Sequence, residues 1–314
     1  MIALVTGGAG FIGSHIAQHL AAAGHHVRVF DNFSAGKREN LRDVPEAQLE
    51  ILEADVRDAA RLEHAISGCD VAFHQAAIVS VPYSVEHPQE THDVNLQGTL
   101  NVLFAAKRQR TKRVVFAGSA AVYGEDPELP KRESMRESPI SPYGVEKLAS
   151  ELYLRTYAKL HGVESVTLRY FNVFGPRQDP RSPYSGVISV LVDRALRGEA
   201  PRLFGDGNQS RDFVFVRDVV QANILAATVP GAGGGVYNVG GGRRTTLNEL
   251  VRMLGRLVGR TITPIHEPPR AGDIRDSLAD ITRARAELGY EPRVSVEEGL
   301  AELVSHVRDA IPKG

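Results

Sequence analysis

The chain of 314 residues has one cysteine, Cys69, and almost no net charge. A single thiol excludes an internal disulfide and fits a reducing compartment, where we expect it to be buried. The 37 Lys and Arg residues nearly balance the 38 Asp and Glu residues, so no overall field attracts nucleic acid or an acidic membrane. An anionic ligand must therefore be held by local groups.

Long apolar runs are also missing. No stretch approaches the roughly 20 residues that cross a membrane, and Met1 leads directly into a strand-like run without the basic segment of a signal peptide. We find neither an internal repeat nor a low-complexity linker. With 42% hydrophobic and 24% charged residues, the composition is that of an ordinary globular protein, which we expect in the cytoplasm.

Short apolar runs alternate with helix-like segments in the first half, which predicts an α/β fold with a Rossmann-type doubly wound parallel sheet. A dinucleotide-binding domain would span residues 1–171, with returning strands near 213–217 and 236–240. Residues 172–314 would mainly form a smaller, interleaved C-terminal substrate-binding lobe. The predicted strands are 2–6, 26–31, 49–53, 71–75, 113–117, 165–170, 213–216 and 236–239. The predicted helices are 14–23, 95–108, 142–161 and 247–258, the last with a capping box from Thr246 to Glu249.

A glycine-rich loop joins the first strand to the first helix. Gly7, Gly10 and Gly13 would let a pyrophosphate approach the N–H groups of the helix N-terminus, where the helix dipole favours an anion. Asp31 ends the second strand, where a carboxylate can bind the 2′-hydroxyl of a ribose and would repel a 2′-phosphate. The sequence therefore predicts NAD, although Lys37 and Arg38 leave NADP open.

Tyr143 and Lys147 are four residues apart and so share one face of a helix. A free tyrosine, with a pKa of about 10, is a poor base at neutral pH. A neighbouring ammonium and an oxidised nicotinamide both favour its phenolate. Ser119 follows a strand at the sheet edge where such folds bind ligands, and its hydroxyl can bond the reacting oxygen. These three residues form the predicted acid–base group.

Segments along nearly the whole chain resemble the extended short-chain dehydrogenase/reductase family, in its branch of UDP-hexose and UDP-N-acetylhexosamine 4-epimerases. The segments are TGGAGFIGSH, DNFSAGKRENL, HQAAIVSVPYS, SPYGVEK, LRYFNVFGPRQDP, FGDGNQSRDFV and HEPPRAGDIRDSLADI. The resemblance implies that Tyr143 is catalytic base and acid, that Lys147 tunes it, and that Ser119 assists. It further implies oxidation at the sugar C4, rotation of the 4-keto sugar and re-reduction, with NAD retained as a cofactor.

The family pattern also assigns binding residues. Expected cofactor contacts are Gly7, Gly10, Phe11, Ile12, Gly13, Asp31, Asn32, Asp55, Val56, Gln75, Ala76, Ala77, Asn95, Tyr143, Lys147 and Phe171. Expected UDP-sugar contacts are Ser119, Tyr143, Asn172, Val187, Ile188, Arg202, Leu203, Phe204, Arg211, Arg270, Asp273 and Ser277. Among them, Asp55 would accept a hydrogen bond from the adenine amino group. Arg211 and Arg270 would clamp the diphosphate, because guanidinium binds phosphate oxygens bidentately.

Alternatives stay open within the family. Dehydratases and decarboxylases carry acidic residues after the serine, where this chain has Ala120 and Ala121. A UDP-glucuronate 4-epimerase, or another sugar-nucleotide-modifying enzyme, survives this test because Arg177 and Arg181 could hold a carboxylate. A non-catalytic NAD(P) sensor is disfavoured, since the tyrosine and the lysine of the acid–base group are both present.

Substrate choice and assembly are further expectations from the resemblance. Ser277 occupies a position where a bulky Tyr excludes N-acetylated sugars in relatives, so acceptance of UDP-GlcNAc and UDP-GalNAc is expected. The expected partners are a UDP-sugar and a second copy of the chain, paired through the helices 95–108 and 142–161. Neither nucleic acid, a membrane nor a metal ion is expected.

Overall fold

The computed structural model describes residues 1–179, 186–268 and 275–310. A seven-stranded parallel sheet forms the centre, in the order β10-β6-β5-β4-β1-β2-β3. Its strands are β1 (Ile2–Thr6), β2 (His26–Asp31), β3 (Leu49–Glu53), β4 (Val71–His74), β5 (Arg113–Ser119), β6 (Glu164–Tyr170) and β10 (Val236–Val239). This confirms the doubly wound parallel sheet that the alternation of apolar runs predicts.

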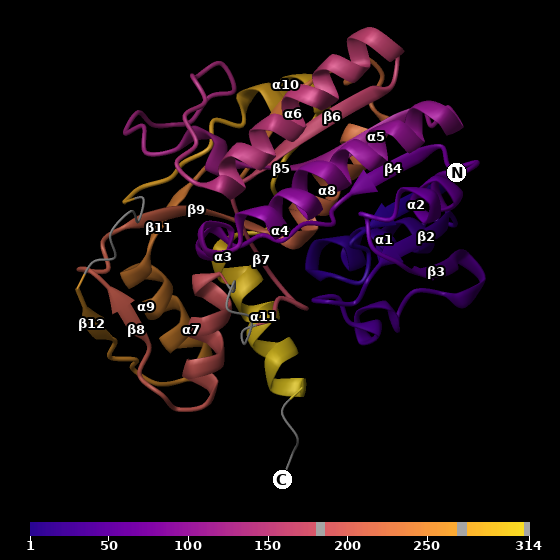
Figure 1. Ribbon diagram of the computed structural model, residues 1–314. Coiled ribbons are helices and arrows are strands. Elements are labelled where there is room, and N and C mark those ends of the chain that lie inside the picture. The colour runs from indigo at the N-terminus through magenta and orange to yellow at the C-terminus, as the bar shows by residue number, and fades with distance from the viewer. Residues whose placement is uncertain (180–185, 269–274, 311–314) are drawn as a thin grey trace.

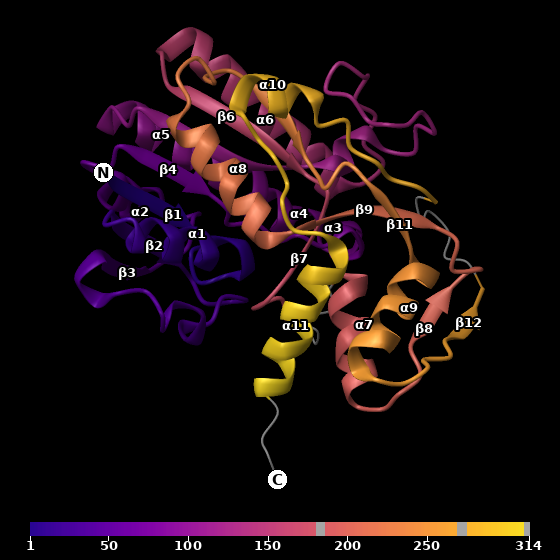
Figure 2. The same ribbon diagram turned by 180° about the vertical axis from the view of Figure 1, so that it is seen from behind.

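Both faces of this sheet are buried, as the apolar strands require. Successive residues of β1 point to opposite faces, so that Ala3 and Val5 join one hydrophobic core and Leu4 joins the other. One face carries α1 (Phe11–Ala22), α8 (Val216–Thr228) and α10 (Thr282–Leu288), as Figure 2 shows from behind. The other carries α2 (Ala59–Ile66), α5 (Gly98–Gln109) and α6 (Pro142–His161) (Figure 1).

Of the two strands expected to return, only one joins this sheet. β10 pairs with β6 at its edge. β9 (Ser210–Phe215) instead forms a three-stranded sheet with β7 (Asn172–Phe174) and β11 (Arg244–Thr246). The reason is packing, because Phe213 and Phe215 lie against Phe174 in a separate core, with ring centroids 6.3 and 5.4 Å apart.

That separate core belongs to a smaller lobe at the lower left of Figure 1. The lobe contains α7 (Val187–Leu196), β8 (Arg202–Phe204), α9 (Leu247–Val258), β12 (Ile265–Glu267) and α11 (Val296–Ala310). Thr246 and Glu249 cap α9 reciprocally, which confirms the predicted capping box. No helix in the described ranges has both the length and the apolar character needed to cross a membrane.

The single helix expected over residues 95–108 is composite. A short helix, α4 (Pro88–His92), runs into the π-helical turn η3 (Asp93–Gln97), and α5 follows. π-helical turns are rare and often mark functional sites. The remaining short elements are α3 (Val81–Glu86) and the 3₁₀ turns η1 (Arg38–Leu41), η2 (Glu46–Gln48) and η4 (Ala120–Tyr123).

Candidate active site

The glycine loop between β1 and α1 is packed too tightly for side chains. Gly7 has a φ of 64°, and a Cβ there would lie 2.7 Å from the backbone nitrogen of Ala76. A Cβ on Gly13 would lie 2.2 Å from the carbonyl oxygen of Gly7. Helix α1 begins at Phe11, three residues before the expected start, and no side chain caps it at Gly10. Its N-terminus can therefore receive an anionic group, which fits a dinucleotide pyrophosphate.

Asp31 stands behind this loop at the end of β2. The side chain is 7% exposed, and its two oxygens accept hydrogen bonds from the N–H groups of Ala9 (2.9 Å) and Phe33 (2.8 Å). Burial raises the pKa of Asp31, and these backbone bonds oppose that rise. The two nearby cations are paired with other carboxylates, Lys37 with Asp179 and Arg38 with Glu53 (both 2.6 Å). The arrangement suits a ribose hydroxyl better than a 2′-phosphate.

Asp55 and Asn32 come together, as two expected cofactor residues should. The Asn32 side-chain amide donates to Asp55 at 2.8 Å. Asp55 is also bound by the guanidinium of Arg57 at 2.7 Å, which lowers the pKa of Asp55 to about 2. This carboxylate is therefore a firmly charged acceptor that already has two protein partners.

The segment after β4 is held in place by hydrogen bonds to side chains. Asn95 accepts from the N–H of Ile78 (2.8 Å) and donates to its carbonyl (3.1 Å), and its other amide proton goes to Glu146 (2.7 Å). Both amide protons of Asn95 are thus used within the protein. Gln75 is bonded to Tyr170 and Asn223. Asn95 and Gln75 thus hold the segment after β4 in place, and their expected contact with the cofactor stays a prediction.

Tyr143, Ser119 and Lys147 meet at the carboxyl edge of the sheet. Tyr143 lies in the first turn of α6, is 9% exposed, and donates its backbone N–H to the hydroxyl of Ser84 at 3.1 Å. Ser119 ends β5, its hydroxyl accepts from the N–H of Ala121 at 3.2 Å, and the same hydroxyl favours ionisation of the phenol. The Lys147 ammonium donates to the carbonyl of Ala117 at 2.9 Å and lies 5.8 Å from the centre of the Tyr143 ring.

The electrostatics of this group differ from the sequence-based expectation. Burial raises the pKa of Tyr143, and the bond with Ser119 opposes that rise. Burial also lowers the pKa of Lys147 to about 8, while the charge of Glu146 opposes that fall. The sequence predicts that Lys147 favours the ionised phenol, whereas the largest effect on the pKa of Tyr143 in the protein is burial, which acts in the opposite direction. The phenolate therefore needs a further positive charge beside it.

On the other side of the site, the structure brings Asn172 and Ser277 together. The Asn172 amide lies 3.3 Å from the Ser277 hydroxyl and 3.3 Å from the carbonyl of Asp212. The Asp212 carboxylate is completely buried and accepts from the N–H groups of Gly241, Gly242 and Ala279. Burial raises the pKa of Asp212 to about 7 against these three bonds. Asp212 fixes the wall on which Ser277 and Asn172 sit.

Other expected substrate residues lie less directly at the site. Leu203 and Ile188 are 1% and 2% exposed, so their side chains belong to the core of the smaller lobe rather than to a ligand surface. Val187 and Phe204, their chain neighbours, are partly exposed. Arg202 pairs with Glu267, and Arg211 donates to the carbonyls of Ser210 and Arg275. Arg270 and Asp273 lie outside the described residues.

Arg177 does not serve as the expected carboxylate holder. Its guanidinium is bonded to Ser14 (3.2 Å) and Gln18 (2.6 Å) of α1 and lies 3.5 Å from Asp43. The side chain thus ties the loop after β7 to the dinucleotide-binding half. Arg181, the other candidate, lies outside the described residues.

Sequence reasoning missed three residues that shape the site: Ser84, Glu146 and Asp212. Glu146 carries a signal, because it shares the buried face of α6 with Tyr143 and Lys147, where an unpaired charge is unexpected. Ser84 and Asp212 give no comparable local signal, since their partners are distant in the sequence.

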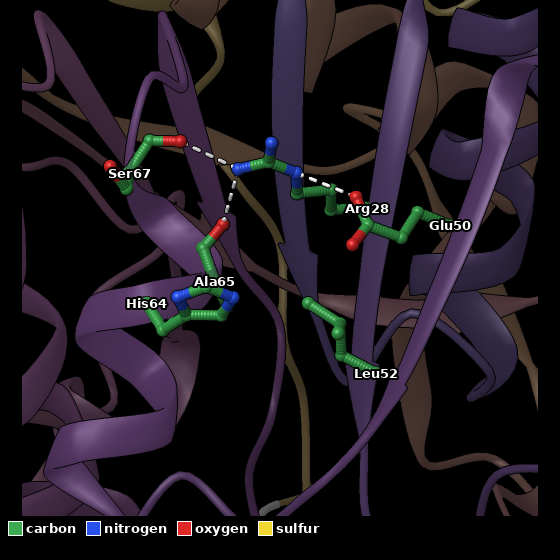
Figure 3. A pocket seen from close by; sticks show the side chains of 6 residues that line it. All are labelled: Arg28, Glu50, Leu52, His64, Ala65 and Ser67. Carbon is green, nitrogen blue, oxygen red and sulfur yellow. Dashed lines mark hydrogen bonds and ion pairs between the residues drawn. The ribbon is translucent and has the colours of Figure 1, made fainter.

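Figure 3 shows a pocket elsewhere, between β2, β3 and the end of α2, lined by Arg28, Glu50, Leu52, His64, Ala65 and Ser67. Arg28 is held there by Glu50 and by the carbonyls of Ala65 and Ser67. Cys69, buried as expected, lies beside it. Because Arg28 is in the first half of β2, this pocket is away from the strand ends that carry the glycine loop and Tyr143.

The fold and this constellation define a dinucleotide-binding enzyme of the short-chain dehydrogenase/reductase class. Residues 3–240 match the NAD-dependent epimerase/dehydratase family, and the chain belongs to that family. Similar solved structures include UDP-glucose 4-epimerase from Thermotoga maritima with UDP-glucose (40% identity, TM-score 0.93, 99% of both chains covered).

Two further structures are comparably similar. One is UDP-N-acetylglucosamine 4-epimerase from Methanobrevibacter ruminantium M1 in complex with UDP-N-acetylmuramic acid (41% identity, TM-score 0.94, 98% of both chains). The other is UDP-glucose 4-epimerase from Thermus thermophilus with NAD (39% identity, TM-score 0.90, 99% of this chain and 100% of that one).

Proposed function

We propose that this protein is an NAD-dependent UDP-sugar 4-epimerase, an isomerase that inverts the configuration at C4 of the hexose. The observation that carries the proposal is the buried phenol of Tyr143, placed beside Lys147 and Ser119 at the sheet edge that also carries the glycine loop. The similar structures are 4-epimerases, with UDP-sugars or with NAD. They support the same reaction for this chain.

The residues that would hold NAD are those of the glycine loop, with Asp31 at the adenosine ribose. When bound, oxidised NAD supplies a hydride acceptor for C4 and the positive charge that the phenolate of Tyr143 needs. Tyr143 then accepts the proton of the 4-hydroxyl and later returns it to the same oxygen. Ser119 holds that oxygen within reach of the phenol. Lys147 stabilises the phenolate by charge.

Epimerisation is favoured over elimination or decarboxylation because the residues after Ser119 carry no acid. Ala120 and Ala121 form the turn η4 directly beside the reacting position. The alternative of a UDP-glucuronate 4-epimerase loses its support from Arg177, whose guanidinium is bonded to α1.

We propose that the hexose lies against Ser277 and Asn172. The hydroxymethyl of Ser277 is small and leaves room for an N-acetyl group, so both UDP-GlcNAc/UDP-GalNAc and UDP-Glc/UDP-Gal are proposed substrates. Ser277→Tyr should reduce kcat/KM on the N-acetylated pair by about a hundredfold, since the added ring overlaps the N-acetyl group. The unmodified pair should change less than about tenfold. An equal loss on both pairs would contradict this position for the sugar.

The proposed function is tested by supplying the purified protein with each of the four UDP-sugars, without added NAD, and measuring C4 isomers. Interconversion of at least one pair is expected, because no net oxidation occurs and the cofactor is not consumed. Absence of isomers in all four reactions, with NAD added in a second series, would sink the proposal.

We also propose a homodimer through the outer faces of α5 and α6. Phe104, Val145, Leu152 and Tyr153 are 42–52% exposed there and form an apolar surface. Light scattering should give twice the chain mass of 34.1 kDa, and Leu152→Glu should reduce it to the monomer. The division into a domain of residues 1–171 and a lobe of mainly 172–314 stays a prediction, as does the cytoplasmic location.

A further inference from the structure

Glu146 lies between Tyr143 and Lys147 on α6 and is 4% exposed. One carboxylate oxygen accepts from the hydroxyl of Thr91 and the other from the amide of Asn95, both at 2.7 Å. These donors are neutral. A carboxylate in a buried site is costly unless its charge is balanced, so its position beside two titratable groups of the active site calls for an explanation.

The charge of Glu146 acts on both groups of the proton-transfer pair. It stabilises the ammonium of Lys147 against burial, and it opposes the loss of the Tyr143 proton. The other titratable groups on the elements near Glu146 have partners of their own or lie near the surface. His74 on β4 is bonded to Thr6 and Thr99, and the carboxylates of Glu90 and Asp93 accept from Tyr83 and Gln89 near the surface, beside the exposed His92.

Glu146 also connects this pair to the wall of the cofactor site. Asn95, which donates to Glu146, holds both backbone groups of Ile78. Ile78 comes two residues after Ala76, whose backbone nitrogen lies only 2.7 Å from where a Cβ on Gly7 would be. The π-helical turn η3 presents Asn95 to both partners at once, because Asn95 stands in its middle. The Glu146 carboxylate therefore acts on Tyr143 and Lys147 and, through Asn95, on the loop beside the glycines.

We propose that Glu146 is a positioning residue whose buried negative charge retains the protons of Lys147 and Tyr143 and anchors the turn at Asn95. This rests on the proposed function, in which Tyr143 transfers the proton of the sugar hydroxyl. Glu146 does not touch the substrate. It sets the pH range in which the pair works.

The test is Glu146→Gln in the protein purified with its cofactor. Without the negative charge, both Tyr143 and Lys147 should lose their protons more readily. Both limbs of the pH profile of kcat/KM should therefore move to lower pH, by about one unit. Glu90→Gln removes an exposed carboxylate from the neighbouring α4 and should leave both limbs in place. Thr91→Val keeps the charge in place but removes one of its hydrogen bonds, so it should lower kcat without moving the limbs.

A second readout does not depend on turnover. The tyrosinate absorbance of each protein is titrated and the curve of the same protein with Tyr143→Phe is subtracted, which isolates Tyr143. In Glu146→Gln the Tyr143 titration should begin about one pH unit lower than in the wild type. If the wild type epimerises no UDP-sugar, the proposed function fails while this titration still tests Glu146.

Unshifted limbs and an unshifted titration in a folded Glu146→Gln protein would overturn the inference, even with an active wild type. Should that variant not fold, Thr91→Val decides, because a shift of its limbs would show that hydrogen bonding rather than charge controls Tyr143 and Lys147. Thermal unfolding of each variant establishes that it is folded.

Discussion

Helix α6 carries two buried groups of charged side chains, and they differ in how the charges are balanced. In the middle of the helix, Glu151 receives two hydrogen bonds from Arg169, at 2.8 and 2.9 Å, and both side chains are 1% exposed. In the first turns, the ammonium of Lys147 donates to a backbone carbonyl, while Glu146 accepts from neutral side chains. In the first group, which we call the matched pair, each buried charge has an opposite charge as its direct partner, and Arg169 also bonds Glu137 at 2.7 Å. In the second group neither charge has an opposite charge as its hydrogen-bond partner.

The difference has a physical consequence. In the matched pair each charge fixes the other, and the bonds to Glu151 raise the pKa of Arg169 even though burial opposes the charge. Arg169 therefore stays charged at neutral pH. In the unmatched group, burial lowers the pKa of Lys147 to about 8. A small change in surrounding charge then changes its protonation, which structural ion pairs resist and proton transfer requires.

The strongest test of this difference between the two groups is Tyr143→Phe. Without the phenolic oxygen the site loses its proton acceptor, so kcat should fall at least a thousandfold, about 4 kcal/mol in the activation barrier. Stability should change by only about 1 kcal/mol, because one bond with Ser119 is lost. Tyr153→Phe, an exposed tyrosine on the same helix, is the control and should retain full activity. A Tyr143→Phe enzyme with more than a tenth of wild-type kcat would refute the assignment.

Arg169→Met tests the opposite group. It leaves the Glu151 carboxylate buried without its partner, which should lower the free energy of unfolding by about 3 kcal/mol. Turnover of the folded fraction should be unchanged, since neither residue touches the Tyr143 group. Urea denaturation measures the loss. Combining it with Glu151→Met should restore most of the stability, because an apolar pair no longer buries a lone charge; failure to recover would point to a different role for the pair.

The parts of the fold that sequence predicts are those set by local pattern. Each strand of the main sheet up to β6 is a short segment with several apolar residues, and the parallel order follows from the helices between them. The sheet that β9 joins could not be predicted in this way. Its choice depends on Phe174, which lies far earlier in the chain, and on a carboxylate, Asp212, that binds backbone of two other segments.

The site shows the same division. Gly7, Asp31 and Tyr143 stand at positions with a sequence signature, and they lie in the loop after β1, at the end of β2 and in the first turn of α6. Arg177 is assigned from its residue type, and Asn95 from the family pattern. Their actual partners, Gln18 and Glu146, are 159 and 51 residues away in the chain. Which hydrogen bond a polar side chain makes is decided by such distant neighbours, so its role cannot be read from its own segment.

His74 adds a third case to this comparison, because it is a buried titratable group that carries no charge. It stacks on Phe116, and its two ring nitrogens are bonded to Thr6 (2.7 Å) and Thr99 (3.0 Å). Thr99 donates its own proton to the carbonyl of Asn95, so it accepts from the ring. Burial lowers the pKa of His74 to about 3, and the charge of Lys147 adds to that fall. A second cation beside Lys147 is thereby avoided.

This neutrality predicts a pH effect of known sign. The folded-state pKa of His74, about 3, lies below the ordinary value of 6.5, so the unfolded chain takes up the proton first as the pH falls. The contribution of His74 to stability is complete above pH 6.5 and should shrink by about 2 kcal/mol between pH 7 and pH 5. In His74→Gln, the free energy of unfolding from urea denaturation should fall by correspondingly less between these two pH values. Replacement of the exposed His64, in His64→Gln, serves as the control. An equal loss of stability in wild type and His74→Gln would mean that the buried ring takes up a proton in the folded protein. His74 would then carry a second positive charge beside Lys147.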